Sequence, residues 1–474
     1  MTKADDSRVL LVAHRAAPGG QPALTTSAGI ALGPLFGRPV LFWAVRELVR
    51  RGRRRFVWAA SGRSSFLEAL CRSVIGPGGD LRVVTVAPEA PIAEAVASCR
   101  RILPDGAPVE VVGPARLERL ARASLARTGA FDGDGRCASG SPEPARRWTH
   151  GPVVRERSFN TLVYDLGAGV VTKSSRRPAS LVDQIDYLQR LPPHLAVFFP
   201  RVLDASRDAE RPWLRMEYYA YPSLSELFLF ADLEVAVWDD IFSRLLDVVA
   251  GRFMTERAPS PPGVLAEMYL GKTARRIARV AGPPLLMSLL ARPAVVVNGR
   301  RLAGVHALWD RIEAAVGALD ERFTWSVIHG DLGFSNILFD LHSGVCRFVD
   351  PRGRFGAPGI YGDPRYDVAK LYHSLIGNYD SIINDLFSVV VKGDDVRFDV
   401  HAATRQAEVR RCFERRFFSL FDRREITLIT ALLFLSMLPL HAESPDRQVA
   451  MYLRGLQLLN NALGKDPSLR LKRK

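Results

Sequence analysis

The sequence predicts two folded parts: an α/β domain at the amino end and, after a linker, an α+β domain with two lobes, the second mostly helical. The length of 474 residues exceeds what one hydrophobic core usually holds. Short β-branched runs alternate with amphipathic segments before residue 125, and a stretch rich in Gly, Ser and Pro follows. We therefore expect a domain at 1–125, a flexible linker at 126–150, a first lobe at 151–222 and a helical lobe at 223–474.

The first domain should contain a largely parallel sheet, because strand and helix patterns alternate along it. Its predicted strands are 9–13, 56–60, 81–86 and 109–112. Apolar residues at helical spacing are clearest at 40–50 and 64–74.

Basic residues exceed acidic ones, with 65 Lys and Arg against 50 Asp and Glu and a formal charge of +15. Such an excess invites an anionic partner. Residues 1–125 contain 18 of the basic residues against 10 acidic ones, with the densest run at 50–55. We interpret that run as a solvated turn because it lacks the aromatic residues that single-strand binders use for stacking. No nucleic-acid partner is expected.

Composition also limits the class of protein. The 47% hydrophobic and 24% charged residues are ordinary globular values and exclude a mostly disordered chain. None of the five cysteines forms a C-x-x-C pair, so we expect neither a disulfide framework nor a zinc site. The most apolar stretch, 426–440, falls short of the roughly 20 residues of a membrane span. We expect a cytoplasmic protein with no membrane span.

The second part of the chain begins with extended runs at 161–165, 170–173 and 213–218, around a helical pattern at 180–191. From 223 onward the pattern is mostly helical. It is interrupted at Asn298 and Gly299, which form a turn signal, and by a loop-rich region at 325–367.

That loop-rich region carries the most informative residues. Apolar runs flank polar loops that contain Asp331, Asn336 and Asp350. Phosphoryl transfer needs a carboxylate that accepts the proton of an attacking hydroxyl, and oxygen ligands that hold Mg²⁺ against nucleotide phosphates. The three residues match these requirements.

The pattern H-G-D-x-x-x-x-N, followed by an apolar strand and Asp, resembles the aminoglycoside phosphotransferase and choline kinase branch of the protein-kinase-like superfamily. The resemblance implies a protein-kinase-like fold, ATP and Mg²⁺ as cofactors, and a small hydroxylated acceptor. It implies that Asp331 is the catalytic base, that His329 braces its loop, and that Asn336 and Asp350 bind the metal. Downstream, Asp367 either ties the loop down or, like Asp363, caps a helix.

The same resemblance suggests residues that bind the nucleotide. Lys173, one of only eight lysines, would reach the α- and β-phosphates. Ser158 and Asn160 lie where the family has a glycine-rich loop, although this stretch has no glycine. The helix at 180–191 offers Asp183 or Asp186 as an acidic partner for the lysine, instead of the family's Glu. Glu217 and Tyr218 resemble the hinge that contacts adenine.

A second resemblance concerns the pathway. The residues after Asp350 and the segments 216–228 and 361–371 resemble phosphotransferase-like proteins of bacterial capsule or surface-polysaccharide biosynthesis, and imply a possible association with glycan biosynthesis enzymes. The turn at 34–43 resembles sugar nucleotidyltransferases, but the stretch at 11–20 lacks their glycine spacing. We therefore expect an inactive nucleotidyltransferase-like, Rossmann-like domain at 1–125.

The main functional hypothesis is an ATP- and Mg²⁺-dependent phosphotransferase that acts on a hydroxyl of a sugar or sugar-like molecule. The alternatives are a nucleotide-binding pseudokinase or scaffold, and a bifunctional kinase and nucleotidyltransferase. The helical region at 223–324 would bind and recognise the acceptor. Within it we interpret Lys272 as a solvated residue rather than a contact to an anionic acceptor.

Overall fold

The structure is a computed structural model. It describes residues 8–12, 34–35, 38–60, 71, 75, 80–85, 92–103, 109–112, 120, 160–165, 168–231, 233–319, 325–400 and 405–464. The chain divides into two compact units. The first is Met1–Arg155 with Ala220–Pro222 and Glu226–Leu233, and the second is the remainder.

The first unit contains the expected parallel sheet, with strand order β5-β4-β1-β6 and parallel pairing throughout. Its core includes Val57, Ala59 and Cys99. Of the helix expected at 64–74, only position 71 lies within the described residues, and it is helical. The described elements are β1 (Arg8–Val12), β2 (Pro34–Leu35), β3 (Arg38–Pro39), α1 (Val40–Arg50), β4 (Arg55–Ala60), β5 (Asp80–Thr85), α3 (Ile92–Arg100) and β6 (Val109–Val112).

The second unit begins with a four-stranded antiparallel sheet, order β7-β8-β10-β9, formed by β7 (Asn160–Asp165), β8 (Val170–Ser175), β9 (Val202–Ser206) and β10 (Trp213–Glu217). Helix α5 (Pro178–Arg190) packs on this sheet, and α6 (Pro193–Ala196) follows it. Lys173 lies on the central strand β8, opposite Leu162 and Leu214. Strands β7, β8 and β10 and helix α5 correspond to the extended runs and the helical pattern expected in this part of the chain.

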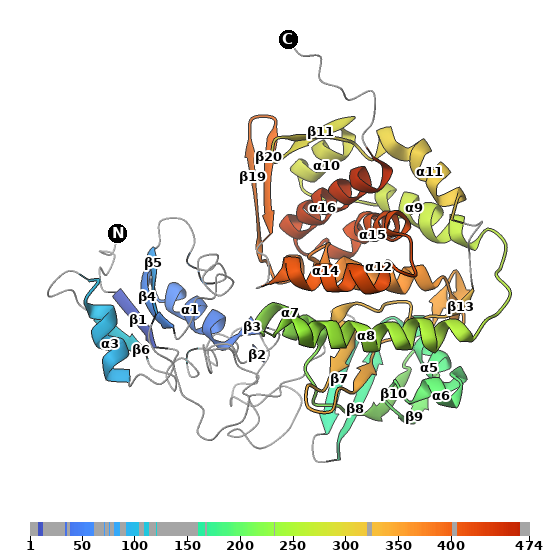
Figure 1. The fold of residues 1–474 in the computed structure, drawn as a ribbon, viewed down its shortest axis with the longest axis horizontal. Helices are drawn as coiled ribbons and strands as arrows, with labels where there is room; N and C mark the ends of the chain where they lie inside the picture. The colour runs from blue at the N-terminus through green and yellow to red at the C-terminus, as the bar shows by residue number, and fades with distance from the viewer. Residues whose placement is uncertain are drawn as a thin grey trace, which may run out of the picture. The chain divides into compact units, whose positions relative to one another are not determined.

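The rest of the unit is mostly helical, as expected (Figure 1). All twelve residues of α12 (Pro364–Leu375) are buried, so this helix forms the centre of the lobe. It packs against α15 (Arg423–Met437), which packs against α16 (Pro445–Leu463). The remaining helices described in this unit are α8 (Val235–Gly251), η2 (Phe253–Thr255), η3 (Ala266–Gly271), α9 (Lys272–Ala278), α10 (Pro284–Ala291), η4 (His306–Leu308), α11 (Trp309–Gly317), η6 (Phe334–Asn336), α13 (Tyr379–Ile383), α14 (Gln406–Phe417) and η7 (Leu438–His441). Most of helix α7 (Leu224–Phe230) belongs to the first unit, which includes Glu226–Leu233.

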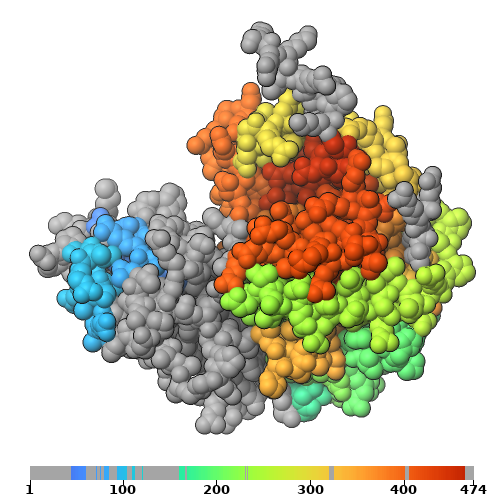
Figure 2. All heavy atoms as spheres, viewed as in Figure 1, coloured from blue at the N-terminus to red at the C-terminus, as the bar shows by residue number. Residues whose placement is uncertain are grey.

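Ion pairs hold two of these helices together on the face that Figure 2 shows, where α8 in green lies beside orange helices. Arg416 of α14 donates from Nε and Nη2 to the carboxylate of Asp239 on α8, at 2.9 and 2.6 Å. Arg415 reaches the same carboxylate at 2.8 Å. Two arginines on one carboxylate fix the register of α14 on α8.

The mostly helical lobe also contains a four-stranded sheet. The strands are β11 (Ala294–Val297), β12 (Arg300–Ala303), β19 (Phe387–Lys392) and β20 (Asp395–Val400), in the order β12-β11-β20-β19. Asn298 and Gly299 form the turn between β11 and β12, both with positive φ, as their turn signal indicated. The hairpin β19–β20 joins this sheet through a parallel pairing of β11 with β20.

The segment Arg423–His441 is long and apolar enough to cross a membrane by length and composition alone. In this structure 72% of its apolar window is buried. Because α15 packs between α12 and α16, it is a core helix of the lobe.

The loop-rich region between the lobes carries only short strands. These are β13 (Ser326–Val327), β14 (Ile337–Phe339), β15 (Cys346–Phe348), β16 (Arg354–Phe355), β17 (Ala357–Pro358) and β18 (Tyr361–Gly362). Strand β13 pairs with β18 and β14 with β15, so the loops that follow β13 and β15 are held at both ends.

Candidate functional site

The loop after β13 is clamped by a buried carboxylate. The backbone N–H groups of His329 and Gly330 donate to the two oxygens of Asp367 at 2.6 and 2.8 Å. Asp363, in contrast, caps α12 by accepting from the backbone N–H of Arg365 at 2.9 Å. The two aspartates therefore have different roles: Asp367 holds the loop through its backbone N–H groups, and Asp363 caps the helix.

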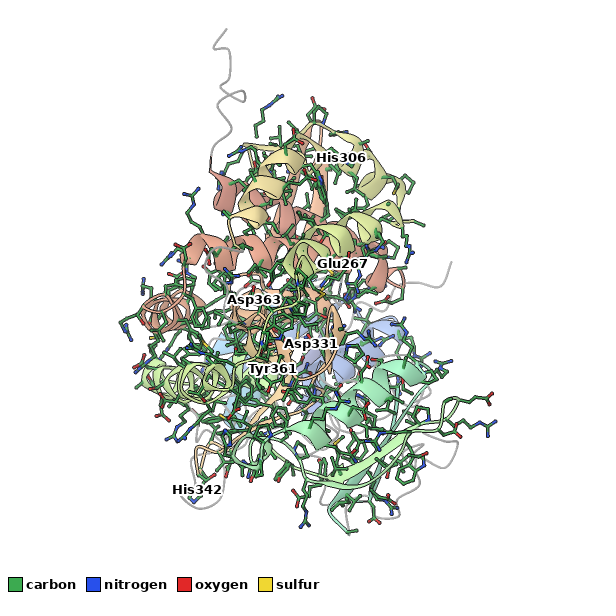
Figure 3. The ribbon with its side chains drawn as sticks, turned by 90° about the vertical axis from the view of Figure 1, so that its right-hand side faces the viewer. Glu267, His306, Asp331, His342, Tyr361 and Asp363 are labelled. Carbon is green, nitrogen blue, oxygen red and sulfur yellow. The ribbon has the colours of Figure 1, made fainter. Side chains whose placement is uncertain are left out.

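Asp331 lies at the end of this clamped loop, between the helical lobe and the sheet of the first lobe (Figure 3). Its side chain is 12% exposed and is paired with two cations. Lys370 Nζ of α12 lies 2.7 Å from Oδ1, and Arg352 Nη2 lies 3.3 Å from Oδ2. These contacts fix the carboxylate in a single orientation, which a positioned proton acceptor requires.

The close approach of Arg352 requires a glycine in the loop. Gly330 has a φ of +77°, and a Cβ built there would lie 2.8 Å from Cβ of Arg352. The backbone N–H of Arg352 donates to the His329 carbonyl at 2.9 Å. The loop after β15 therefore rests directly on the loop that carries Asp331.

His329 links these two loops through its ring. The ring is fully buried; Nε2 lies 3.0 Å from the Val349 carbonyl, and Nδ1 lies 3.2 Å from the backbone nitrogen of Asp331. Burial lowers the pKa of His329 to about 4. The neutral ring then donates from Nε2–H to Val349 and accepts at Nδ1 from Asp331. His329 thus connects the two loops through the Val349 carbonyl and the backbone N–H of Asp331.

Lys173 meets Asp350 across the two lobes. Lys173 Nζ lies 2.6 Å from Oδ1 of Asp350 and 2.7 Å from Oε1 of Gln184 on α5. Gln184 Nε2 lies 3.3 Å from the same Asp350 oxygen. The lysine side chain is only 7% exposed. A strand, a helix and a loop therefore converge on one ammonium group.

The prediction that Asp183 or Asp186 of α5 pairs with Lys173 is wrong, because both aspartates pair with arginines. Asp183 pairs with Arg354 at 2.7 Å, and Asp186 pairs with Arg207 at 2.8 Å. The residue between them, Gln184, faces the lysine and is buried with the apolar side of α5. A neutral amide stands where the family resemblance implied a carboxylate.

The candidate metal ligands are the side-chain oxygens of Asn336 and Asp350. Asn336 Nδ2 donates to the Asp331 carbonyl at 2.8 Å, which fixes the amide and leaves Oδ1 as its acceptor. Asp350 has a φ of +59°, a rare backbone conformation that occurs often at functional sites. Among the described residues no group of three or more His, Cys, Asp or Glu could hold a metal. Two oxygen side chains suit Mg²⁺, which takes further ligands from phosphates and water.

For the other candidate nucleotide-binding residues, the structure gives positions on or beside the strands of the first lobe. Ser158 lies outside the described residues. Asn160 begins β7, paired with Ser175, two positions along β8 from Lys173. At the end of β10, the carboxylate of Glu217 accepts from the Tyr219 hydroxyl at 2.7 Å, which lowers the pKa of Glu217. The backbone N–H of Tyr218 donates to the Gly169 carbonyl at 2.9 Å.

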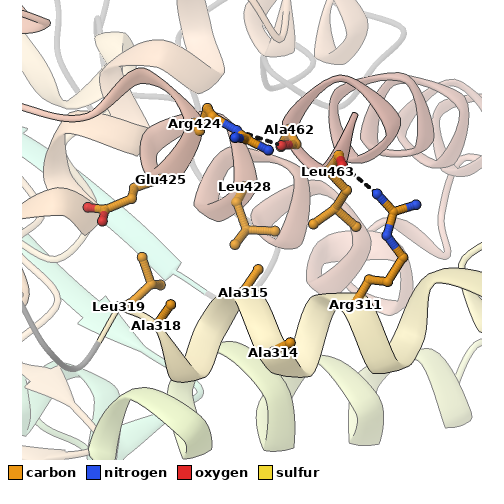
Figure 4. Close-up of a pocket in the computed structure, with 10 residues that line it drawn as sticks. All are labelled: Arg311, Ala314, Ala315, Ala318, Leu319, Arg424, Glu425, Leu428, Ala462 and Leu463. Carbon is orange, nitrogen blue, oxygen red and sulfur yellow. Dashed lines mark hydrogen bonds between the residues drawn. The ribbon is translucent and has the colours of Figure 1, made fainter. Parts of the chain in front are cut away.

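A cavity of about 460 Å³ lies elsewhere, between α11, α15 and α16 (Figure 4). Arg311 and Arg424 donate to backbone carbonyls at its rim, and apolar side chains make up most of its wall. None of the residues above lines it.

Three residues of the site were missed in the sequence: Gln184, Arg352 and Lys370. Gln184 had a usable signal, since Leu181, Ile185 and Leu188 define the buried side of the helix and position 184 lies on that side. Lys370 is one of eight lysines and lies on the helix that begins at Pro364. Arg352 follows Asp350 by two positions, on the same loop after β15.

No family model and no curated protein matches the chain. Among solved structures, the chain resembles aminoglycoside-3'-phosphotransferase of type VIII at 17% identity, over 56% of this chain and 84% of that one, with a TM-score of 0.34. It resembles a thermostable mutant of aminoglycoside phosphotransferase APH(4)-Ia, in complex with AMP-PNP and hygromycin B, at 14% identity over 65% and 93% of the chains, with a TM-score of 0.42. A Plasmodium vivax ethanolamine kinase is 9% identical over 80% and 95%, with a TM-score of 0.29.

Proposed function

We propose that this chain is an ATP- and Mg²⁺-dependent phosphotransferase that phosphorylates a hydroxyl group of a small molecule. One observation carries the proposal. Asp331 is held by Lys370 and Arg352 on a clamped loop, and Arg352 lies two positions from Asp350, the carboxylate that Lys173 reaches from the other lobe. A proton acceptor and an oxygen ligand thus lie on adjoining loops, and a buried cation on β8 reaches the oxygen ligand.

In the proposed reaction, the acceptor hydroxyl attacks the γ-phosphorus of ATP and the bond from γ-phosphorus to the bridging oxygen breaks, which releases ADP. Asp331 accepts the hydroxyl proton. Lys173 contributes positive charge toward the phosphates, and its distance of 2.6 Å from Asp350 brings that charge to the metal side of the site. His329 and Asp367 keep the loop in place and take no part in proton transfer.

Asp350 and Asn336 would hold Mg²⁺, which neutralises charge on the phosphates when bound. The amide of Asn336 is oriented for this by its bond to the Asp331 carbonyl. That bond also couples the metal ligand to the backbone of the proposed base.

The deciding experiment compares the wild-type chain with Asp331→Asn. We expect transfer from Mg²⁺-ATP, or its slow hydrolysis when no acceptor is present, to fall about 100- to 10,000-fold, since this is the range that general base catalysis contributes. Binding of AMP-PNP, measured by calorimetry, should stay within a few-fold of wild type. Asp340→Asn, at a turn where Asp340 bonds only its own loop, is the matched control.

Two results would contradict the proposal. Full turnover of Asp331→Asn would remove Asp331 from the reaction. Binding of AMP-PNP by a wild-type chain that neither hydrolyses nor transfers would instead favour the nucleotide-binding scaffold, a function for which the neutral Gln184 beside Lys173 argues.

The sequence resemblance supports a finer proposal: a sugar or sugar-like acceptor in surface-polysaccharide biosynthesis, a cytoplasmic location and association with other glycan enzymes. For residues 1–125 it supports an inactive nucleotidyltransferase-like domain, and the parallel sheet of β1, β4, β5 and β6 agrees with this class. Release of pyrophosphate from a nucleoside triphosphate and a sugar phosphate would instead indicate the bifunctional enzyme.

A further inference from the structure

The sheet of the helical lobe has two edge strands, β12 and β19, and they differ in how their outer backbone groups are used. At the β12 edge, the side-chain amide of Asn460 on α16 accepts from the backbone N–H of Ala303 at 2.9 Å and donates to its carbonyl at 3.0 Å. That amide occupies groups with which a further strand would pair. For β19, the outer strand of the hairpin labelled in Figure 1, the described part of the chain offers no hydrogen bond beyond those to β20.

The neighbouring strand β20 shows which backbone groups of β19 point outward. The N–H and the carbonyl of Phe398 bond to the side chain of Asn298, at the end of β11, at 2.8 and 2.7 Å. Both groups of Phe398 therefore point away from β19. Because this direction alternates along an antiparallel pair, Val390 and every second residue of β19 bond to β20. The residues between them turn their N–H and carbonyl groups to the outer edge: Phe387, Val389 and Val391.

Strand β19 lacks the features that usually keep an edge from pairing, which are prolines, bulges, charges and short length. Its six residues contain no proline, and their register with β20 is unbroken. The edge strand β9 of the first lobe, in contrast, has a register shift. Val390 and Val391 are 48% and 49% exposed, and the one charged residue, Lys392, lies at the turn. This edge therefore suits addition of another strand.

The edge is complementary to itself in the antiparallel direction. Hydrogen-bonded pairs form only where outward-pointing residues face one another. This condition is met when Val389 faces Val389 of a second copy, so that Phe387 faces Val391 and Ser388 faces Val390. A shift of one residue breaks the alternation, and a shift of two pairs fewer residues. Apolar pairs of this kind contribute about 0.2–1 kcal/mol each.

The charges at the ends of the strand also fit a second copy. In this register Lys392 faces Leu386 of the other chain and comes next to its Asp385, whose side chain is 46% exposed. No two like charges face each other along the paired strands. Closed pairs with two-fold symmetry are the commonest oligomers, and a two-fold axis at Val389 gives such a pair.

We propose that the chain forms a two-fold dimer in which β19 pairs with β19 of a second copy, with Val389 at the axis. The two four-stranded sheets then join into one sheet of eight strands. An interface of a few residues gives weak association that depends on concentration. The dimer does not rest on the proposed phosphotransfer, since no residue of that site takes part.

The first test is sedimentation velocity of the full chain from about 1 to about 200 µM, the range in which weak interfaces associate. We expect the wild type to change from monomer to dimer. Val389→Pro removes the outward N–H at the axis and leaves the ladder to β20 intact, since proline is tolerated on that side of an edge strand. It should weaken association at least about tenfold, the loss expected from about 1.4 kcal/mol. Ser388→Thr, which keeps every backbone group of the same strand, is the matched control.

The second test reads the register. In the proposed pairing the Cα atoms of Val389→Cys lie about 5.5 Å apart across the axis, within the range that a disulfide spans. Val390→Cys, the matched control, faces Ser388 instead, so its two sulfurs are too far apart to join. After mild oxidation, a non-reducing gel should show a covalent dimer for position 389 and only the background for position 390. The wild type under the same oxidant measures that background.

Three results would overturn the inference: sedimentation as a monomer at every concentration, a dimer that Val389→Pro leaves at full strength, or equal cross-linking at positions 389 and 390. A monomer that gains mass only with another protein would place a different partner on this edge. Melting curves show whether Val389→Pro folds, and the cysteine pair decides the matter if it does not. Neither readout depends on ATP, so the dimer and the phosphotransfer can each fail alone.

Discussion

Lys173 Nζ and Oδ1 of Asp350 lie 2.6 Å apart, although 177 positions separate the two residues in the sequence. The pair joins strand β8 of the first lobe to the loop that follows β15. It is assisted by a tight backbone contact nearby: a Cβ at Gly353 would lie 2.1 Å from the Asp183 carbonyl oxygen on α5. The relative position of the two lobes is thus fixed by contacts of the loop that carries Asp350 and Gly353.

A double-mutant cycle should detect this pair. Asp350→Asn leaves the buried ammonium of Lys173 without its carboxylate and should destabilise the unit by about 2–4 kcal/mol. Lys173→Met should cost less, because the carboxylate that it leaves is 30% exposed. The double variant should lose less than the sum, with a coupling energy of about 1–3 kcal/mol. Urea unfolding of the four proteins measures the cycle. Strict additivity of the two losses would show that the contact is not formed in solution.

The neutral partner of Lys173 gives a second prediction. Gln184→Met keeps the size of the side chain but removes the acceptor of a buried ammonium, at a cost of about 1–3 kcal/mol. We expect a raised KM for ATP, because Lys173 is no longer held toward Asp350 from the side of α5.

Asp183→Asn is its control. It weakens only the pair with Arg354, whose side chain is 45% exposed, and such exposed pairs contribute about 0–1 kcal/mol. The two variants change neighbouring positions on one helix. If Asp183→Asn raised KM for ATP as much as Gln184→Met, the contact between Lys173 and Gln184 would not be the one that positions the lysine.

Positions 183 and 184 show which contacts of the site local sequence patterns could predict and which they could not. The order of loops and strands around Asp331, Asn336 and Asp350 followed from local patterns, because each residue is placed by the few residues beside it. The partner of Lys173 depends instead on the rotation of α5 about its axis. The expected acidic partner was Asp183 or Asp186, whereas the apolar stripe of Leu181, Ile185 and Leu188 indicates Gln184.

The missed hairpin has a different cause. Strand β20, which pairs with β19, also pairs with β11 about 100 residues earlier, and no local pattern predicts so distant a pairing. Most of β19 is exposed, with Val390 and Val391 about half accessible, so it shows no alternation of buried and exposed positions. Its run of three valines before Gly393 was nevertheless a usable strand and turn signal.

Asp367 should be essential for the order of the loop that carries Asp331. Asp367→Ala leaves the buried N–H groups of His329 and Gly330 without their acceptor, and each unsatisfied group costs about 1–3 kcal/mol. Amide hydrogen exchange should accelerate at these two residues, and kcat should fall while the KM for ATP changes little. Asp367→Asn keeps one acceptor oxygen and should show an intermediate effect. Unchanged exchange in Asp367→Ala would contradict the clamp.

The last prediction concerns the charge of His329, whose folded pKa is about 4. An unfolded histidine titrates near 6.5, so between these values the unfolded chain binds the extra proton. The contribution of His329 to stability is therefore present above about pH 6.5 and is lost as the pH falls toward 4, by at most about 3 kcal/mol. Asp367 acts in the opposite direction, since burial raises its pKa to about 7 and its folded form keeps a proton that the unfolded form releases.

The two effects oppose each other in wild type, so the comparison uses His329→Gln, which still can donate to the Val349 carbonyl and leaves Asp367 in place. The free energy of unfolding of wild type minus that of the variant should decrease as the pH falls from about 7 to about 5, because only wild type carries the depressed histidine. In a two-bond ¹H–¹⁵N spectrum, the ring of His329 should stay neutral with the proton on Nε2 throughout this range. A His329 ring that became protonated near pH 6.5 would show that it is solvated rather than buried between the two loops, and would remove its role as a brace.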